Sequence, residues 1–436
     1  MARKAITKVQ IVIIVVVILI IAAVAFTAYY YTTPPPPTPS PAPSQAPAPT
    51  PTPTPTPAPT PAPRPPIKVG LVLPLTGPAA KLGQRGVDQF MMAVEEINGA
   101  GGVLGRPINV IIEDDEGNPD KFLTVVKKLI EIDKVDLLMG PLHTGNLIAG
   151  SDYIASKGIP LITPFSYGPI LLYQKDPVKF RGFFSLWMNT EDAARGLLTF
   201  IRDVAKAKTF VYIGETLTFS ITAGEYLELH AKEIGIQCLE RITVPVGCKD
   251  FSDVILKIRG LNPDVVVTTI YSGAEVTLVR QWYEQKVPKS LCGLTALFAE
   301  WDLVDLIGEQ SDYVCFVAPM WNVSITEKTI RYYNKFYEKY GYKIGGSALA
   351  YDGMYFVKAV IEKAGTLDPE VLIKACEEVE IIGAAGRIKI DSRTHGPIYG
   401  PGYIDWIIGQ WIGGKPYVIY PSHLAEAEFR KAPWWG

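Results

Sequence analysis

Four consecutive acidic side chains form the densest cluster of groups in the chain that could do chemistry. They are Glu113, Asp114, Asp115 and Glu116, at the end of a strand-like apolar run. Paired carboxylates can transfer protons in hydrolysis or hold a divalent cation. The same residues can also form a solvated loop before the helix expected from Pro119, and the sequence favours that interpretation. The alternative is that these carboxylates transfer protons in a hydrolase anchored at the cell surface.

His143 is the histidine best placed to serve such an enzyme. It stands between a predicted strand and a predicted helix, and ligands of open α/β sheets bind at turns of this kind. No nucleophile or base is evident beside it in the sequence, so a polar wall residue is the simpler interpretation. The hydrolase alternative requires His143 to lie within about 8 Å of the carboxylates of 113–116.

The motifs of several other chemistries are missing from the sequence. The turn after the first predicted strand lacks GxGxxG, and no P-loop, GxSxG, HExxH or SxxK motif occurs. The five cysteines and four histidines are scattered without CxxC spacing. We therefore expect no cofactor, no metal and no catalytic residue. A Cys238–Cys248 disulfide and free thiols both remain open.

Net charge and length limit the remaining classes. The formal charge is −2, with no basic run beyond the first residues, so nucleic acid is not an expected partner. The chain from Ile67 onward is too long for one ordinary core, which predicts two lobes.

Apolar runs alternate with amphipathic helical stretches from Ile67 onward. Strands are predicted at 67–73, 108–113, 135–139, 159–162, 209–213, 236–244, 265–269, 291–294 and 314–317. Helical spacing fills the intervals, and three further helices at 326–340, 347–364 and 369–379 precede a β-like tail. Fully apolar strands alternating with helices indicate parallel sheets covered on both faces. The predicted class is α/β, with two doubly wound lobes.

Motifs spread over almost all of 67–436 carry a family resemblance. They are IKVGLVLPLTGP at 67–78, AVEEIN at 93–98 with GGVLGRPI at 101–108, EDD at 113–115 with NP at 118–119, GP at 140–141, IPLITP at 159–164 and YDG at 351–353. In order and spacing they resemble the leucine/isoleucine/valine-binding protein family of extracellular solute-binding proteins. The resemblance implies the type I periplasmic-binding-protein fold, with two lobes joined by three crossovers. Lobe I would be 67–187 plus 320–387, and lobe II 188–319 plus 388–436.

The function implied by this resemblance is that of a receptor in an ABC importer. Such a protein binds an amino acid or a related small polar solute between closing lobes and delivers it to a permease driven by ATPase subunits. It is not an enzyme. A ligand sensor of the same fold on the cell surface remains an alternative.

The resemblance also places a ligand site at strand ends on lobe I. The hydroxyl that holds the ligand carboxylate falls on Thr144, and Gly145 opens the following helix. The family's backbone contacts fall on Phe165 and Ser166, and its second hydroxyl falls on Tyr167. Tyrosine there is a departure that fills more of the pocket, so Ser166 could take over.

Further contacts are implied on the pocket wall and on lobe II. They are the wall residue Leu82, the aromatic contacts Phe219 and Tyr271, and the acid Asp192 near the closure seam. The family's ammonium-binding glutamate falls on Thr295, which is the largest departure. Unless Glu300 or Asp302 supplies the missing charge, the ligand is not a plain α-amino acid, because an unpaired buried ammonium is costly.

The segment 1–31 predicts a membrane anchor. A basic leader precedes an apolar run over 11–28, which at ~1.5 Å per residue crosses most of a ~30 Å hydrocarbon core. Positive charge only on the N-terminal side places Met1 in the cytoplasm. A cleaved secretory signal with a site at 23–25 is the alternative. Arg3-Lys4-Ala5 also resembles the processing site of archaeal pilin-like signal peptides, where cleavage leaves the anchor in place.

The segment 32–66 predicts a stiff stalk. It consists almost entirely of Pro, Thr, Ala and Ser, and proline removes backbone donors and favours polyproline II. About 35 residues at ~3.1 Å each could extend about 100 Å. We therefore expect a single-pass protein of the cell membrane whose globular part is extracellular.

Overall fold

The computed structural model describes residues 64–270, 272–288 and 290–434. The predicted anchor at 1–31, residues 32–63 of the predicted stalk, and Tyr271 lie outside these ranges. No helix within the described ranges combines the length and the apolar character needed to cross a membrane.

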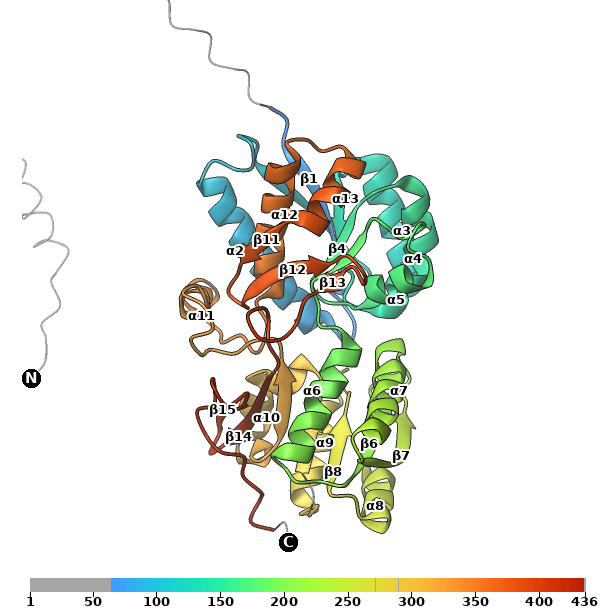
Figure 1. Ribbon diagram of the computed structural model, residues 1–436, viewed down its shortest axis with the longest axis vertical. Coiled ribbons are helices and arrows are strands. Elements are labelled where there is room, and N and C mark those ends of the chain that lie inside the picture. Colours follow the sequence, from blue (N-terminus) through green and yellow to red (C-terminus); the bar gives the residue numbers. More distant parts are fainter. Residues whose placement is uncertain (1–63, 271, 289, 435–436) are drawn as a thin grey trace, which may run out of the picture. The chain divides into compact units, whose positions relative to one another are not determined.

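The first sheet has five parallel strands in the order β2-β1-β3-β4-β5. The strands are β1 (Ile67–Leu73), β2 (Ile108–Asp114), β3 (Leu137–Met139), β4 (Leu161–Thr163) and β5 (Phe183–Ser185). The elements between them are α2 (Ala80–Gly99), α3 (Pro119–Lys128), the π-helical turn η1 (Leu129–Asp133), α4 (Thr144–Lys157) and α5 (Gly168–Lys175). The predicted α/β alternation is confirmed here (Figure 1).

Helices cover both faces of this sheet because its strands are apolar on both sides. Val69 and Leu71 of β1 belong to the core formed with α2 and with later helices, whereas Val72 packs in the core formed with α3 and α4. Helix α3 begins sharply, since the Asn118 side chain accepts hydrogen bonds from the first-turn N–H groups and Pro119 follows it.

The second sheet has seven strands in the order β15-β14-β10-β9-β8-β6-β7. The strands are β6 (Thr209–Glu215), β7 (Gln237–Val244), β8 (Val265–Thr268), β9 (Ser290–Gly293), β10 (Cys315–Ala318), β14 (Ile407–Ile412) and β15 (Lys415–Tyr420). The helices between them are α6 (Thr190–Asp203), α7 (Thr218–Glu233), α8 (Ser252–Leu261), α9 (Glu275–Glu284) and α10 (Asp302–Ile307), with short 3₁₀ turns η2 (Ala296–Ala299) and η3 (Gly308–Ser311). Strands β6 to β10 run parallel, and β14 and β15 add an antiparallel edge.

The chain passes between the two sheets three times, as the resemblance implies. It leaves the first sheet after β5, returns after β10 and leaves again before β14. The returning segment contains α11 (Thr329–Tyr340), α12 (Leu349–Ala364), α13 (Pro369–Glu378), β11 (Glu380–Ile382), β12 (Arg387–Asp391) and β13 (Gly396–Pro397). Helices α11 and α12 pack against α2, which attaches this segment to the first sheet's lobe.

One expected segment boundary needs correction. The boundary at 387 falls within the antiparallel ladder of β11, β12 and β13. The end of this ladder also contacts the first sheet, because Ser185 N–H donates to the His395 carbonyl oxygen at 2.9 Å. The chain therefore leaves the first lobe after Pro397 rather than at 387.

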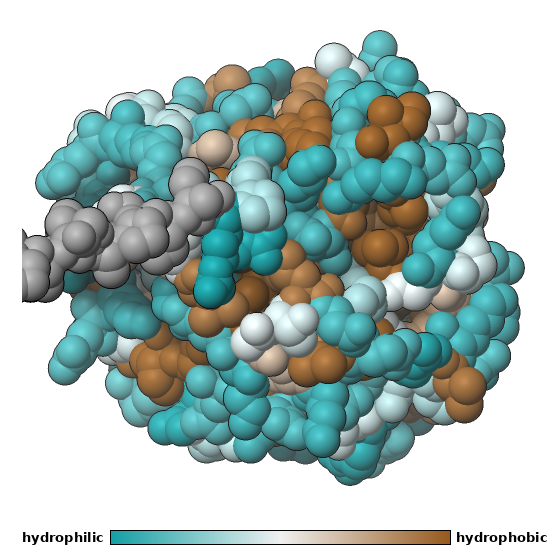
Figure 2. Space-filling model, turned by 90° about the horizontal axis from the view of Figure 1, so that it is seen from above, coloured by the Kyte–Doolittle hydropathy of each residue, from teal (hydrophilic) through white to brown (hydrophobic). Residues whose placement is uncertain are grey.

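The five cysteines are free thiols, so the Cys238–Cys248 disulfide does not form in this structure. Cys292 and Cys315 are buried neighbours on β9 and β10. The face of the molecule that Figure 2 shows is mainly hydrophilic, with separate apolar patches.

Candidate functional site

A cavity of about 110 Å³ lies where the strands of both sheets end. Its lining residues are Leu82, Arg85, Gly86, Gln89, Leu142, Thr144, Phe165, Tyr167, Trp187, Phe219, Thr295, Leu297, Glu300 and Ser347. They come from α2, from the turns after β3, β4, β5 and β9, from α7, and from the approach to α12. Parallel α/β sheets bind ligands at this edge, so the cavity is the candidate site.

Thr144 stands at the first position of α4 and faces the cavity. Its hydroxyl lies 2.9 Å from the Ser166 hydroxyl oxygen, which also accepts the Gly168 N–H at 3.0 Å. Ser166 is buried behind Thr144 and does not line the cavity. Ser166 therefore supports Thr144, and the expected replacement of Tyr167 by Ser166 as a ligand contact has no geometric basis here.

Phe165, the expected backbone contact, and Tyr167, the expected second hydroxyl, form parts of the wall. Phe165 packs on α2 at Gly86, where an added Cβ would lie 2.7 Å from the Phe165 Cζ. Tyr167 is buried and contacts Phe219 of the second lobe edge-to-face, with ring centroids 6.0 Å apart. Burial raises the pKa of Tyr167 well above its usual value, so its hydroxyl stays protonated.

The remaining expected residues divide into four groups. Leu82, Phe219 and Thr295 line the cavity, whereas Gly145 lines a neighbouring cavity instead. Asp192 is half-buried and lines neither cavity. Its burial is the main cause that raises its pKa, and the negative charge of Glu191 raises the pKa further. The predicted contact Tyr271 lies outside the described residues.

Sequence reasoning named Glu300 but missed Arg85, with which Glu300 forms a buried pair of opposite charges. Arg85 of α2 and Glu300 of the second lobe are each about 6% exposed, and the guanidinium Nη1 lies 3.1 Å from the carboxylate Oε2. That oxygen also accepts the Gly345 N–H at 3.0 Å. Arg85 binds Asp302 as well, at 2.8 Å, and Asp302 binds Lys81 at 2.7 Å. Lys81 and Arg85 thus join the first lobe to Glu300 and Asp302 of the second.

A sequence signal for Arg85 did exist. It stands among the buried residues of α2, between Gly83 and Val87, in a helix whose other buried positions are mainly apolar or small. An arginine on such a face requires a partner. The partner's identity depends on a contact between the two lobes, which the spacing of residues along one helix does not reveal.

A second cavity of about 320 Å³ adjoins the first through Thr144 and Phe219, which line both. The first residues of α4 and α7 face it from opposite lobes, and a Cβ at Gly145 would lie 3.7 Å from the Thr218 hydroxyl. Neither helix has a side-chain cap. Two uncapped helix N-termini favour an anion at this junction.

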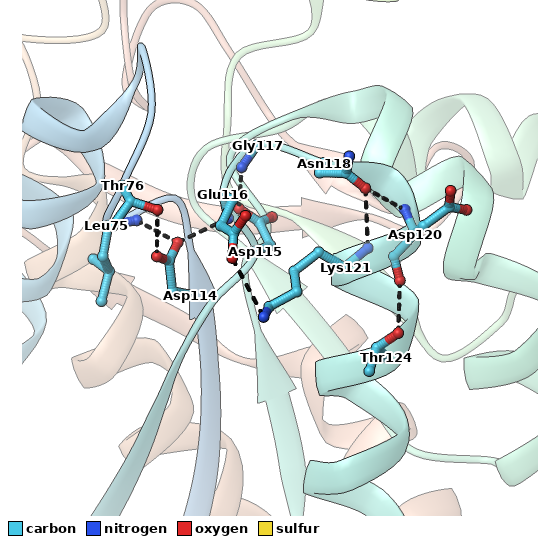
Figure 3. Close-up of polar contacts among 10 residues, drawn as sticks. All are labelled: Leu75, Thr76, Asp114, Asp115, Glu116, Gly117, Asn118, Asp120, Lys121 and Thr124. Carbon is cyan, nitrogen blue, oxygen red and sulfur yellow. Dashed lines mark hydrogen bonds and ion pairs between the residues drawn. The ribbon is translucent and has the colours of Figure 1, made fainter.

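The acidic cluster builds a loop beside this second cavity (Figure 3). Asp114 accepts hydrogen bonds from Leu75 N–H, the Thr76 hydroxyl and Glu116 N–H at 2.7–2.8 Å, and these bonds hold its pKa below the usual range despite partial burial. Asp115 accepts the Gly117 N–H and the Asn146 side-chain amide. The carboxylates of Asp114 and Asp115 therefore hold the β2–α3 loop in position.

His143 lies beside this loop, at Gly117. Its ring carbon Cε1 would be 3.2 Å from a Cβ at Gly117, and Glu116 lines the same cavity. Burial lowers the pKa of His143 to about 4, and the negative charge of Glu215, which raises this pKa, offsets only part of the shift. Because Glu116 is ion-paired with Lys121 and the neighbouring acids are hydrogen-bonded, the arrangement favours a wall residue over an acid/base pair.

The comparisons with known proteins agree with this geometry. The family model described as periplasmic binding protein matches residues 66–415. The Leu/Ile/Val-binding protein homolog 7 of Brucella suis is 24% identical over 389 residues, which cover 84% of this chain and 94% of the relative.

Two solved structures share the fold. The branched-chain amino acid transporter substrate binding protein LivJ from Streptococcus pneumoniae, in complex with isoleucine, has a TM-score of 0.71 at 20% identity, covering 82% of this chain and 100% of that chain. A solute binding protein of an ABC transporter from R. palustris, in complex with benzoate, has a TM-score of 0.73 at 19% identity, covering 85% and 99%.

Proposed function

Because the chain belongs to the periplasmic binding protein family, we propose that it is the solute receptor of an ABC importer. It binds an amino acid or a related small carboxylate between its lobes and delivers it to a permease, which ATPase subunits drive. The observation that carries the proposal is the cavity at the strand ends, whose wall combines Thr144 and Phe165 of one lobe with Phe219 and Thr295 of the other.

The geometry supports ligand-dependent closure. Glu300 and Phe219 of the second lobe contact Arg85 and Tyr167 of the first, so the cavity wall is complete only when the lobes meet. A ligand that touches both walls favours the closed arrangement by its differential contacts. The closed protein presents a surface that the open protein lacks, and a permease can recognise this difference.

A carboxylate is the ligand group best supported at the Thr144 end. The hydroxyl of Thr144 and the uncapped first turns of α4 and α7 provide donors and positive helix ends. The isoleucine and the benzoate in the two solved neighbours are both carboxylates. These observations support the class of ligand and leave its side chain open.

The experiment is a binding screen with the full-length protein in detergent. Isothermal calorimetry and thermal shift are measured with amino acids, their amides and small carboxylates. We expect micromolar or tighter binding of at least one carboxylate, with a smaller radius of gyration on binding. If no compound of these classes binds, the proposal of a solute receptor is wrong.

We also propose that the receptor is held at the cell surface by its first 31 residues and spaced from the membrane by 32–66. The basic leader, the apolar run and the proline-rich segment support this location. A tether raises the effective concentration of receptor near its permease. Fractionation tests it: the protein should stay with membranes after a salt wash, and protease should release the globular part from intact cells.

A further inference from the structure

In the part of the chain that the structure describes, the cavity offers no free negative charge to an amino group. Within the described residues, Glu300 is the carboxylate that lines it, and this side chain is already engaged by Arg85 and by Gly345 N–H. Asp302, the other candidate for the missing charge, is paired with Arg85 and Lys81. Thr295 offers only a hydroxyl. An ammonium in this cavity would stay unpaired beside a guanidinium, which is unfavourable.

Three buried polar atoms of the lining, besides the Arg85 Nη1 that is ion-paired with Glu300, lack a hydrogen bond within the described part of the chain. They are Arg85 Nε, Gln89 Oε1 and Thr295 Oγ1. Each of these side chains is at most 6% exposed. Folded proteins bury few such atoms, so their convergence on one cavity indicates that a ligand or water completes them.

Arg85 and Gln89 define what the far end of the ligand must offer. They are four residues apart on α2, so they lie one above the other on the same helix face. The Arg85 Nε–H donates and the Gln89 Oε1 accepts, while Thr295 from the opposite lobe can do either. A hydroxyl group, which accepts and donates at once, matches this set better than an ammonium or a methyl group does.

The middle of the cavity favours a ring. Phe165, Trp187 and Phe219 line it with Leu142 and Leu297. Its volume of about 110 Å³ approaches the roughly 150 Å³ of an engineered protein cavity that binds benzene. Aromatic walls favour an aromatic guest in edge-to-face or offset arrangements, and the volume limits that guest to one ring.

We infer that the ligand is a single-ring aromatic carboxylic acid that carries no ammonium and bears a hydroxyl opposite its carboxylate. This inference rests on the proposed function and specifies the substrate class of the same site. The carboxylate lies against Thr144 and the first turn of α4, the ring lies between the aromatic walls, and the hydroxyl reaches Arg85, Gln89 and Thr295.

The test compares ligands that differ in one group, by calorimetry on the full-length protein. The pairs are 3-phenylpropanoate with phenylalanine, 4-methylpentanoate with leucine, 4-hydroxybenzoate with benzoate, and benzoate with cyclohexanecarboxylate. In the first two pairs, we expect the member without an ammonium group to bind at least tenfold more tightly than the amino acid. The 4-hydroxyl should tighten binding about tenfold, the change expected for one added hydrogen bond, and benzoate should bind more tightly than its saturated analogue.

Two variants at one position sharpen the test. Thr295→Val keeps the shape and removes the hydroxyl, so it should reduce the preference for 4-hydroxybenzoate over benzoate. An unchanged thermal-unfolding midpoint of the ligand-free variant reports correct folding. Thr295→Glu supplies an anionic acceptor and should bind phenylalanine at least tenfold more tightly than the unmodified protein does.

The possible failures are distinguishable. Tighter binding of leucine or phenylalanine than of their ammonium-free counterparts overturns the ligand class and leaves the solute-receptor proposal standing. Equal binding of benzoate and 4-hydroxybenzoate overturns the assignment of the far-end hydroxyl. Absence of binding by every amino acid and carboxylate in the panel overturns the proposed function itself.

Discussion

Replacing Arg85 by methionine should weaken ligand binding far more than it weakens folding. The substitution keeps a long unbranched side chain on α2 but removes the positive charge that faces Glu300 across the lobes. When the lobes close, Glu300 becomes buried at about 6% exposure without its cation. In an open protein water can solvate Glu300, so the penalty falls mainly on closure.

The size of the effect follows from the burial of the pair. Breaking a buried ion pair by removing one partner costs about 3–5 kcal/mol, which corresponds to a dissociation constant raised by roughly a hundredfold or more. Lys81→Met is the matched control, because Lys81 is 67% exposed in its ion pair with Asp302. An exposed pair contributes about 0.2–1 kcal/mol, so this variant should change affinity by no more than about fivefold.

The assay is calorimetry with benzoate, which lacks the ring hydroxyl and therefore does not depend on a hydrogen bond from Arg85 Nε. The double variant Arg85→Met/Glu300→Gln removes the unpaired carboxylate and should regain much of the lost affinity. Two results would refute the reasoning. One is an unchanged dissociation constant in Arg85→Met. The other is a loss of unfolding free energy in the ligand-free protein as large as the loss in binding, which would make the ion pair a folding contact.

Three further predictions concern single residues. Thr144→Ala should weaken carboxylate binding by about 1–2 kcal/mol in calorimetry, while thermal unfolding without ligand changes little, because the hydroxyl behind Thr144 retains the Gly168 N–H. Burial raises the pKa of Glu275 from 4.5 to about 7, so between these pH values the folded protein holds a proton that the unfolded chain has lost. The free energy of unfolding of the protein should therefore fall by about 3 kcal/mol as pH rises through this interval. Glu275→Gln should remove this fall when urea unfolding is compared at pH 4 and pH 8. Gly86→Ala should push the Phe165 ring toward the cavity and weaken benzoate binding at least tenfold, whereas Gly145→Ala, whose Cβ would make only ordinary contacts, should leave binding within a few-fold.

The fold could be predicted because its signals are local. An apolar run such as IKVGLVL at 67–73 has too few polar positions for a half-exposed strand, and it forms β1, buried on both faces. The return of the chain to the first lobe was also evident from the late helices. The boundary at 387 was implied by the resemblance, which does not reveal that β12 pairs with β11 and β13.

The site could be predicted only in part, because its walls meet across the lobes. Thr144, Phe165 and Tyr167 follow strand ends along the chain, so a resemblance and the rule for parallel sheets suffice to place them. Arg85 acquires its role only when Glu300, far along the chain, packs against it. Neither residue has a local pattern that identifies the other.

The departure at Thr295 and the ion pairs of Arg85 both bear on the charge that the cavity offers to a ligand. The sequence suggested that Glu300 or Asp302 could replace the ammonium-binding glutamate that is absent at Thr295. The structure gives both carboxylates to Arg85 and Lys81, so neither replaces it. A cavity with a hydroxyl at Thr295 and a buried, paired arginine suits an α-amino acid poorly, although its Thr144 end suits a carboxylate. Thr295 and the paired Arg85 therefore act together in the proposed preference for a ligand without an ammonium group.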